Sequence, residues 1–132
     1  MISYKDYLLL AFSHFDKNET AYIDVGEYET LLFRMWSELR NVYMGKSISI
    51  LLLGGGVTTI KGKSEKNYTE LLRCMLCTLR NSQFQPTQGI TIVLTKSVMD
   101  KIDIVVYNEN QFDESAKFSL RKHQSMLAFH IF

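Results

Sequence analysis

The sequence predicts an α/β fold in which the strands of a parallel sheet are joined by crossover helices. Two apolar runs rich in β-branched residues, Ile48–Leu53 and Ile90–Leu94, have the length and composition of buried strands. Two other segments, residues 24–42 and 67–79, carry apolar residues at helical spacing. Alternation of such strands and helices is typical of a parallel sheet with crossover connections.

The first expected strand is Tyr7–Phe12, an apolar run that is followed by a polar loop over residues 14–20. The first helix is predicted to begin after Asp24, and Glu27 completes a capping box three residues later. Gly45 stands where a C-terminal cap is expected. The apolar face of this helix is predicted to consist of Tyr28, Leu31, Leu32, Met35, Leu39 and Val42.

The second expected strand, Ile48–Leu53, is predicted to be buried on both faces, and three consecutive glycines follow it. Glycines allow a sharp turn and leave backbone N–H groups uncovered by side chains. We expect this turn to lead into a helix at the carboxyl end of a parallel strand, where α/β proteins bind anionic ligands. The alternative is a turn that only reverses the chain. The candidate binding residues are Leu53, Gly54, Gly55, Gly56, Val57 and Thr58.

The second helix is expected to follow a polar loop over residues 61–66, because Asn67 and Glu70 repeat the capping pattern. Ile90–Leu94 is the third expected strand, and residues 102–106 are a candidate fourth. The apolar face of the second helix is predicted to consist of Leu71, Leu72, Met75, Leu76 and Leu79.

The length, composition and net charge of the chain favour one soluble globular domain. The 132 residues are 46% hydrophobic and 22% charged, with a net charge of +1. A nucleic-acid-binding protein usually has a large excess of positive charge, and this chain does not. No apolar run approaches the roughly 18 residues that span a bilayer, and the first residues do not resemble a signal peptide. We expect a cytoplasmic protein, with a domain over residues 1–106 and a tail over residues 107–132 that has no clean period.

Residues 16–27 match part of a calcium-binding EF-hand loop. The residues at its first, third, fifth, ninth and twelfth positions are Asp16, Asn18, Thr20, Asp24 and Glu27. Ala21 stands at the sixth position, where the sharp turn requires glycine, and no second loop accompanies this one. A polar loop followed by a capped helix explains the same residues without a metal.

The remaining motifs do not complete a site. The five residues that separate Gly56 from Gly62-Lys63-Ser64 are one more than a phosphate-binding P-loop has. Cys74 and Cys77 form a C-x-x-C within a helix and not at its start, so we expect buried thiols there. Trp36 is expected in the core. No spacing predicts a catalytic residue, a metal site or a cofactor.

These segments together resemble the macro domains, in particular those attached to bacterial Thoeris-type anti-phage effectors. The likeness covers about residues 7–106, and it includes Tyr7–Ser13, Phe15-Asp16, the helix that carries Trp36 and the helix over residues 67–79.

The most specific part of the likeness is the glycine turn. In that family a Leu-Gly-Ser/Thr-Gly-Ile/Val motif wraps the phosphates of ADP-ribose or a related nucleotide. Three residues depart from the family's pattern. Gly55 stands where the motif has Ser or Thr, Leu51 stands where the family often has proline, and Thr59 stands where it often has arginine. The matching residues are Leu53, Gly54, Gly56, Val57 and Thr58.

The resemblance implies a three-layer macro-like fold that is incomplete at its N-terminus. Earlier strands of the family, and an early loop that holds the distal ribose and adenine, would precede Met1. The resemblance further implies a module that binds ADP-ribose or a related nucleotide signal in anti-phage defence. Catalysis is not expected, because the residues on which macro-domain hydrolases depend belong to that earlier part.

Two alternatives remain, an ADP-ribose-processing hydrolase and an EF-hand-like calcium-binding protein. We also expect the isolated chain to form homo-oligomers or to aggregate unless its N-terminal half is supplied. The reason is that a sheet with a missing strand leaves apolar surface exposed.

Overall fold

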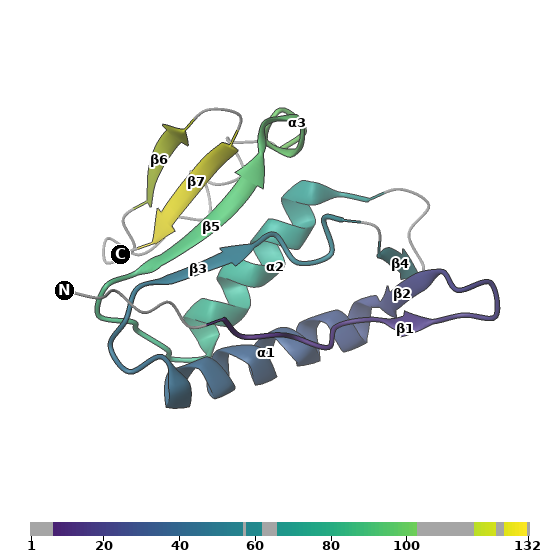
Figure 1. The fold of residues 1–132 in the computed structure, drawn as a ribbon, viewed down its shortest axis with the longest axis horizontal. Helices are drawn as coiled ribbons and strands as arrows, with labels where there is room; N and C mark the ends of the chain where they lie inside the picture. Colours follow the sequence, from purple (N-terminus) through teal and green to yellow (C-terminus); the bar gives the residue numbers. More distant parts are fainter. Residues whose placement is uncertain (1–6, 57, 62–65, 103–117, 124–125, 132) are drawn as a thin grey trace.

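The computed structural model describes residues 7–56, 58–61, 66–102, 118–123 and 126–131 as a mixed α/β structure (Figure 1). The described strands are β1 (His14–Phe15), β2 (Ala21–Asp24), β3 (Ile48–Leu51), β4 (Thr59–Lys61), β5 (Ile90–Thr95), β6 (Phe118–His123) and β7 (Met126–Ile131). The described helices are α1 (Val25–Val42), α2 (Tyr68–Asn81) and α3 (Lys96–Met99). The predicted α/β class is therefore confirmed.

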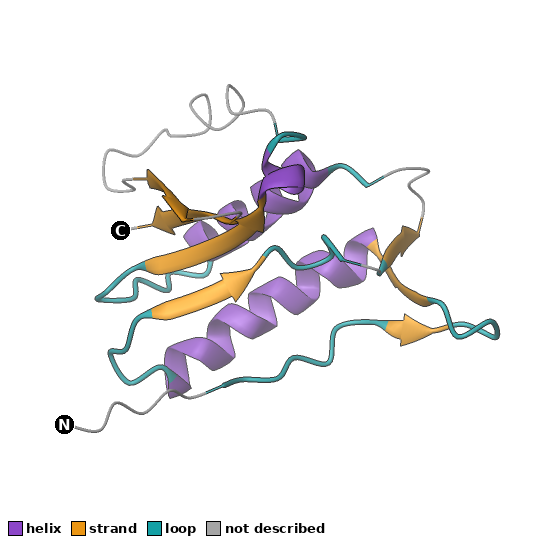
Figure 2. Ribbon diagram, turned by 45° about the horizontal axis from the view of Figure 1, so that its top comes forward, coloured by secondary structure: helices purple, strands orange, loops and turns teal. Residues whose placement is uncertain are grey.

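The strands form two small sheets, which Figure 2 shows as separate groups. One sheet has the order β1-β2-β4 and the other has the order β3-β5-β7-β6. The pairs β2–β4 and β3–β5 are parallel, whereas β1–β2, β5–β7 and β6–β7 are antiparallel. The wholly parallel sheet that the sequence predicts is thus replaced by two mixed sheets.

The crossover from β3 to β5 follows the prediction. The two strands pair in register from Ile48 with Ile90 to Leu51 with Val93, and α2 lies between them in the chain. A parallel pair requires such a long connection, because a tight turn can join only antiparallel strands. This pair carries the glycine turn at its carboxyl end.

Both long helices begin as predicted. The Asp24 carboxylate accepts a hydrogen bond from the Glu27 N–H at 2.8 Å, and the Asn67 side chain accepts one from the Glu70 N–H at 3.1 Å. Each cap satisfies a donor that the first helical turn leaves unpaired. The C-cap of α1 is Tyr43, and Met44 (φ +51°) and Gly45 (φ +73°) follow it with left-handed backbones, so Gly45 lies just beyond the cap that was predicted there.

The core lies between the two helices and one face of β3 and β5. Trp36 of α1 is fully buried, and its indole N–H donates to Thr78 Oγ1 of α2 at 2.9 Å. Side chains of β5 enter the core at every second residue, as a strand with one buried face requires. The core residues of β5 are Ile90, Ile92 and Leu94.

β3 does not have the two buried faces that were predicted for it. Only every second residue of β3 is partly buried, and the Leu51 side chain is 68% exposed. β3 is an edge strand, and both described long helices cover the same side of it (Figure 2). Among the described residues, the third layer of the predicted three-layer arrangement is not seen.

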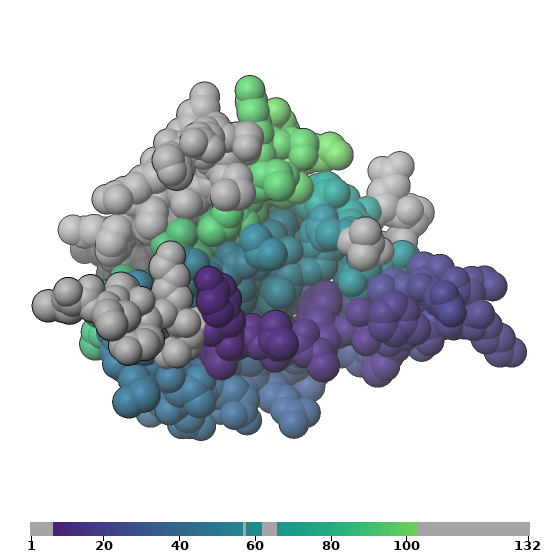
Figure 3. Space-filling view, viewed as in Figure 1, coloured from purple at the N-terminus to yellow at the C-terminus, as the bar shows by residue number. Residues whose placement is uncertain are grey.

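The prediction of a strand at Tyr7–Phe12 is wrong. The segment has no regular structure, and strand pairing begins only at His14 of β1. Leu9 is 99% exposed, and the segment lies on the molecular surface in Figure 3. An apolar run becomes a strand only where another strand is available to pair with it, and no described strand pairs with this run.

The C-terminal part of the chain adds to the sheet. β7 pairs with β5 over six residues, and β6 pairs with β7. The sequence did not assign these two strands, and the expected boundary at residue 106 lies outside the described residues. Of the candidate fourth strand, only Ile102 lies within the described residues, and it is buried. None of the helices in the described part of the chain is both long enough and apolar enough to cross a bilayer.

Candidate functional site

The glycine turn follows β3 and leads into a short strand. The Gly55 N–H donates to the Leu52 carbonyl at 3.1 Å, which closes the turn. The chain then continues into β4, which pairs in parallel with β2. The sequence predicts a helix capped at Asn67 some residues after this turn, and α2 does begin at Tyr68. The short strand β4 between the turn and α2 was not predicted.

The three glycines have different surroundings. Gly54 is buried and has a φ of +80°, and a Cβ added there would lie 3.4 Å from side-chain atoms of Tyr28 and Leu71. A Cβ on Gly55 would lie 3.0 Å from the Leu52 carbonyl oxygen. Gly56 is exposed, its φ is not positive, and a Cβ there would meet no heavy atom within 4 Å. The fold thus requires glycine at position 54, whereas Gly56 leaves its backbone open to solvent.

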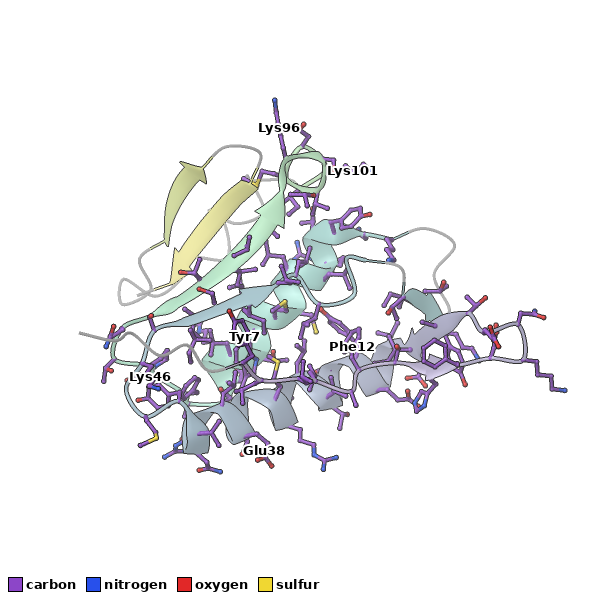
Figure 4. The ribbon with its side chains drawn as sticks, viewed as in Figure 1. Tyr7, Phe12, Glu38, Lys46, Lys96 and Lys101 are labelled. Carbon is purple, nitrogen blue, oxygen red and sulfur yellow. The ribbon has the colours of Figure 1, made fainter. Side chains whose placement is uncertain are left out.

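Tyr28 of α1 supports the turn from the core side. Its hydroxyl donates to the Leu53 carbonyl at 2.8 Å and lies 3.4 Å from the Leu71 carbonyl of α2. Burial raises the pKa of this hydroxyl far above its usual value, so it is a protonated donor at neutral pH. The ring of Phe12 packs edge-on against Tyr28, with centroids 5.6 Å apart; Phe12 is labelled in Figure 4.

Lys66 supports the turn from the solvent side, because its ammonium donates a hydrogen bond to the Gly56 carbonyl. Partial burial lowers the pKa of this amine. In its ammonium form, Lys66 places a positive charge at the exposed end of the turn. Of the other candidate residues, Leu53 and Thr58 are half-buried, and Val57 lies outside the described residues.

Sequence reasoning missed both supporting residues. Tyr28 was predicted only as part of an apolar face, and Lys66 only as part of a polar loop. The capping signal at Asn67 places Lys66 directly before a helix, but no local pattern links either residue to the glycines. The contacts arise because the fold brings α1, and the segment just before α2, next to the glycine turn.

The EF-hand alternative does not fit the observed geometry. Residues 16–20 connect β1 to β2, whereas an EF-hand loop is entered from a helix. The Asp16 carboxylate accepts hydrogen bonds from the N–H groups of Asn18 and Thr20, and the Glu27 carboxylate pairs with His14 Nε2 at 3.0 Å. These contacts, with the Asp24 cap, are those of a polar loop followed by a capped helix.

The cysteines only partly follow the prediction. Cys74 is half-buried, whereas Cys77 is exposed, so the expectation of two buried thiols is wrong for Cys77. Burial raises the pKa of the Cys74 thiol to about 11, which disfavours its thiolate. The segment Gly62–Ser64, which the P-loop comparison needs, lies outside the described residues.

Comparisons with known proteins point to one family. The sequence model described as "Thoeris protein ThsA, Macro domain" matches residues 1–95. A curated relative, "Thoeris protein ThsA" of Bacillus amyloliquefaciens (strain Y2), is 32% identical over 112 residues. The alignment covers 83% of this chain but only 37% of the relative. The chain therefore spans little more than a third of the length of the curated relative that it matches.

Proposed function

Since the chain belongs to the family of ThsA macro domains, we propose that it binds ADP-ribose or a related nucleotide signal in bacterial anti-phage defence, without turning the ligand over. The binding residues in this proposal are those of the glycine turn: Leu53, Gly54, Gly55, Gly56, Val57 and Thr58.

The observation that carries this proposal is the open backbone at Gly56 beside the Lys66 ammonium. Phosphate groups bind well to exposed backbone N–H groups, and glycine allows the closest approach. No described group accepts a hydrogen bond from the N–H of Gly54 or of Gly56. A diphosphate at the exposed Gly56 would gain its N–H as a donor and a favourable charge, and the N–H of Gly54 lies at the more buried start of the same turn.

Binding without catalysis is supported by the side chains that contact the turn. Hydrolysis needs a group that accepts a proton near neutral pH. Tyr28 stays protonated, and Lys66 is an amine that already donates to the turn. The alternative, an ADP-ribose-processing hydrolase, is tested by following free ADP-ribose or an ADP-ribosylated peptide over time with the purified chain.

The three-layer arrangement of a complete macro domain belongs to the same proposal. Helices cover one side of β3, and Ser49 and Leu51 on its other side are exposed. A third layer would cover the exposed Leu51 side chain on this side of β3.

Calorimetry with ADP-ribose tests the function, with Gly56→Val as the decisive variant. A valine side chain meets no protein atom near its Cβ, so the variant is expected to fold, but it blocks approach of a phosphate to the backbone. Gly26→Val is the control, because Gly26 is also exposed, its φ is not positive, and its added Cβ would make only an ordinary contact of 3.6 Å with Asp24 Oδ1.

We expect binding by the parent and by Gly26→Val, and its loss in Gly56→Val. Equal binding by Gly56→Val would show that the turn is only structural. Tight magnesium-dependent binding of ATP in place of ADP-ribose would favour a phosphate loop of another class.

A further inference from the structure

We propose that Tyr28 is a positioning residue that directs the backbone of the glycine turn toward its ligand. This inference rests on the proposed function, because it assigns the turn a nucleotide to bind. Tyr28 itself lies in the core and approaches the turn from the side of α1 and α2, so it acts through the backbone.

The orientation of one peptide group carries the argument. The Leu53 carbonyl points at the Tyr28 hydroxyl, with an oxygen–oxygen distance of 2.8 Å. The carbonyl and the N–H of a trans peptide point in opposite directions, and no cis peptide occurs among the described residues. The N–H of Gly54 is therefore directed away from Tyr28, and no described group accepts a hydrogen bond from it.

The hydroxyl has one proton, so it can donate fully to only one of its two neighbours. The Leu53 carbonyl, at 2.8 Å, has better geometry than the Leu71 carbonyl, at 3.4 Å. Position 71 also lies in α2, where its carbonyl can accept from the helix backbone. The hydrogen bond to Leu53 is consequently the one that orients the turn.

Packing fixes the hydroxyl in place. The ring of Tyr28 occupies the position next to Gly54, where an added Cβ would lie 3.4 Å from a ring carbon. The ring of Phe12 packs edge-on against the Tyr28 ring. Because these contacts hold the ring in place, the position of the hydroxyl follows from the position of α1. The N-cap at Asp24 fixes where α1 begins. Loss of the hydroxyl leaves the Leu53 carbonyl without this partner and allows the peptide group to rotate.

The variant Tyr28→Phe tests this role, because it removes the hydroxyl and keeps the ring. The matched control is Thr78→Val, which removes the buried hydrogen bond to Trp36 in the same core but does not touch the turn. Both variants should lower the melting temperature. Only Tyr28→Phe should weaken ADP-ribose binding, by about 3- to 10-fold, the usual effect of one lost hydrogen bond.

A second measurement does not depend on the ligand. With seven glycines in the chain, selective ¹⁵N-glycine labelling gives a simple spectrum in which the Gly54 amide can be followed. We expect Tyr28→Phe to shift or broaden this signal, and Thr78→Val to leave it unchanged. An unchanged Gly54 signal, or unchanged affinity in Tyr28→Phe, would overturn the positioning role. If the parent fails to bind ADP-ribose but the Gly54 signal shifts in Tyr28→Phe, the proposed function fails and the turn-orienting role stands.

Discussion

Gly54→Ala should be less stable than Gly56→Ala by about 1–2 kcal/mol in the free energy of unfolding. Gly54 has a φ of +80°, and an L-residue in a left-handed conformation costs roughly 1–2 kcal/mol. Its added Cβ would lie 3.4 Å from two side-chain atoms, which is close to an ordinary contact and adds little. Gly56 has neither constraint, because its φ is not positive and its Cβ position is open.

Comparing the two alanine variants cancels the effect that each substitution has on the unfolded chain. Each substitution makes the unfolded chain less flexible, which by itself stabilises a protein by about 0.4–1 kcal/mol. Because this contribution is the same at both positions, the difference between the variants reports the backbone conformation of the folded state.

Urea unfolding followed by Trp36 fluorescence measures this difference. Trp36 is the single tryptophan of the chain and is fully buried, so its emission follows loss of the core. Protein concentration must be equal in all samples, because association changes apparent stability. Equal free energies of unfolding for the two variants would refute the distinct roles assigned to these glycines.

Three further predictions follow from other parts of the structure. Millimolar calcium should leave the melting temperature unchanged, because residues 16–27 form a loop and a helix cap. A ligand at a hundred times its dissociation constant adds about 2.7 kcal/mol to the free energy of unfolding. A clear rise in melting temperature with calcium would therefore contradict this prediction. Lys66→Ala should lower the affinity for ADP-ribose and make that affinity less dependent on salt, whereas Lys17→Ala, in an exposed loop, should change neither. Equal affinities of the two variants at low and high salt would exclude a role for the Lys66 charge. The isolated chain should sediment as an oligomer or aggregate, because Tyr7–Leu10 and Leu51 are exposed, and a monodisperse monomer would show that this surface is tolerated.

Local patterns were sufficient to predict α1, α2, β3 and β5. The caps at Asp24 and Asn67 and the apolar stripes behind them depend on residues three or four positions apart, so the sequence alone locates α1 and α2. β5 was located in the same way from Ile90–Leu94. The glycine run also marked the turn, and its likeness to macro domains agrees with the family match.

Strand pairing and the contacts of the turn were decided only by the tertiary structure. Tyr7–Phe12 is as apolar as β5 but does not become a strand, because pairing depends on a neighbour that local sequence does not specify. Which of the three glycines has a positive φ, and that it is Gly54 and not Gly56, is seen only in the folded structure. Tyr28 and Leu53 are far apart in the chain, and their hydrogen bond forms only because the fold brings α1 next to the glycine turn.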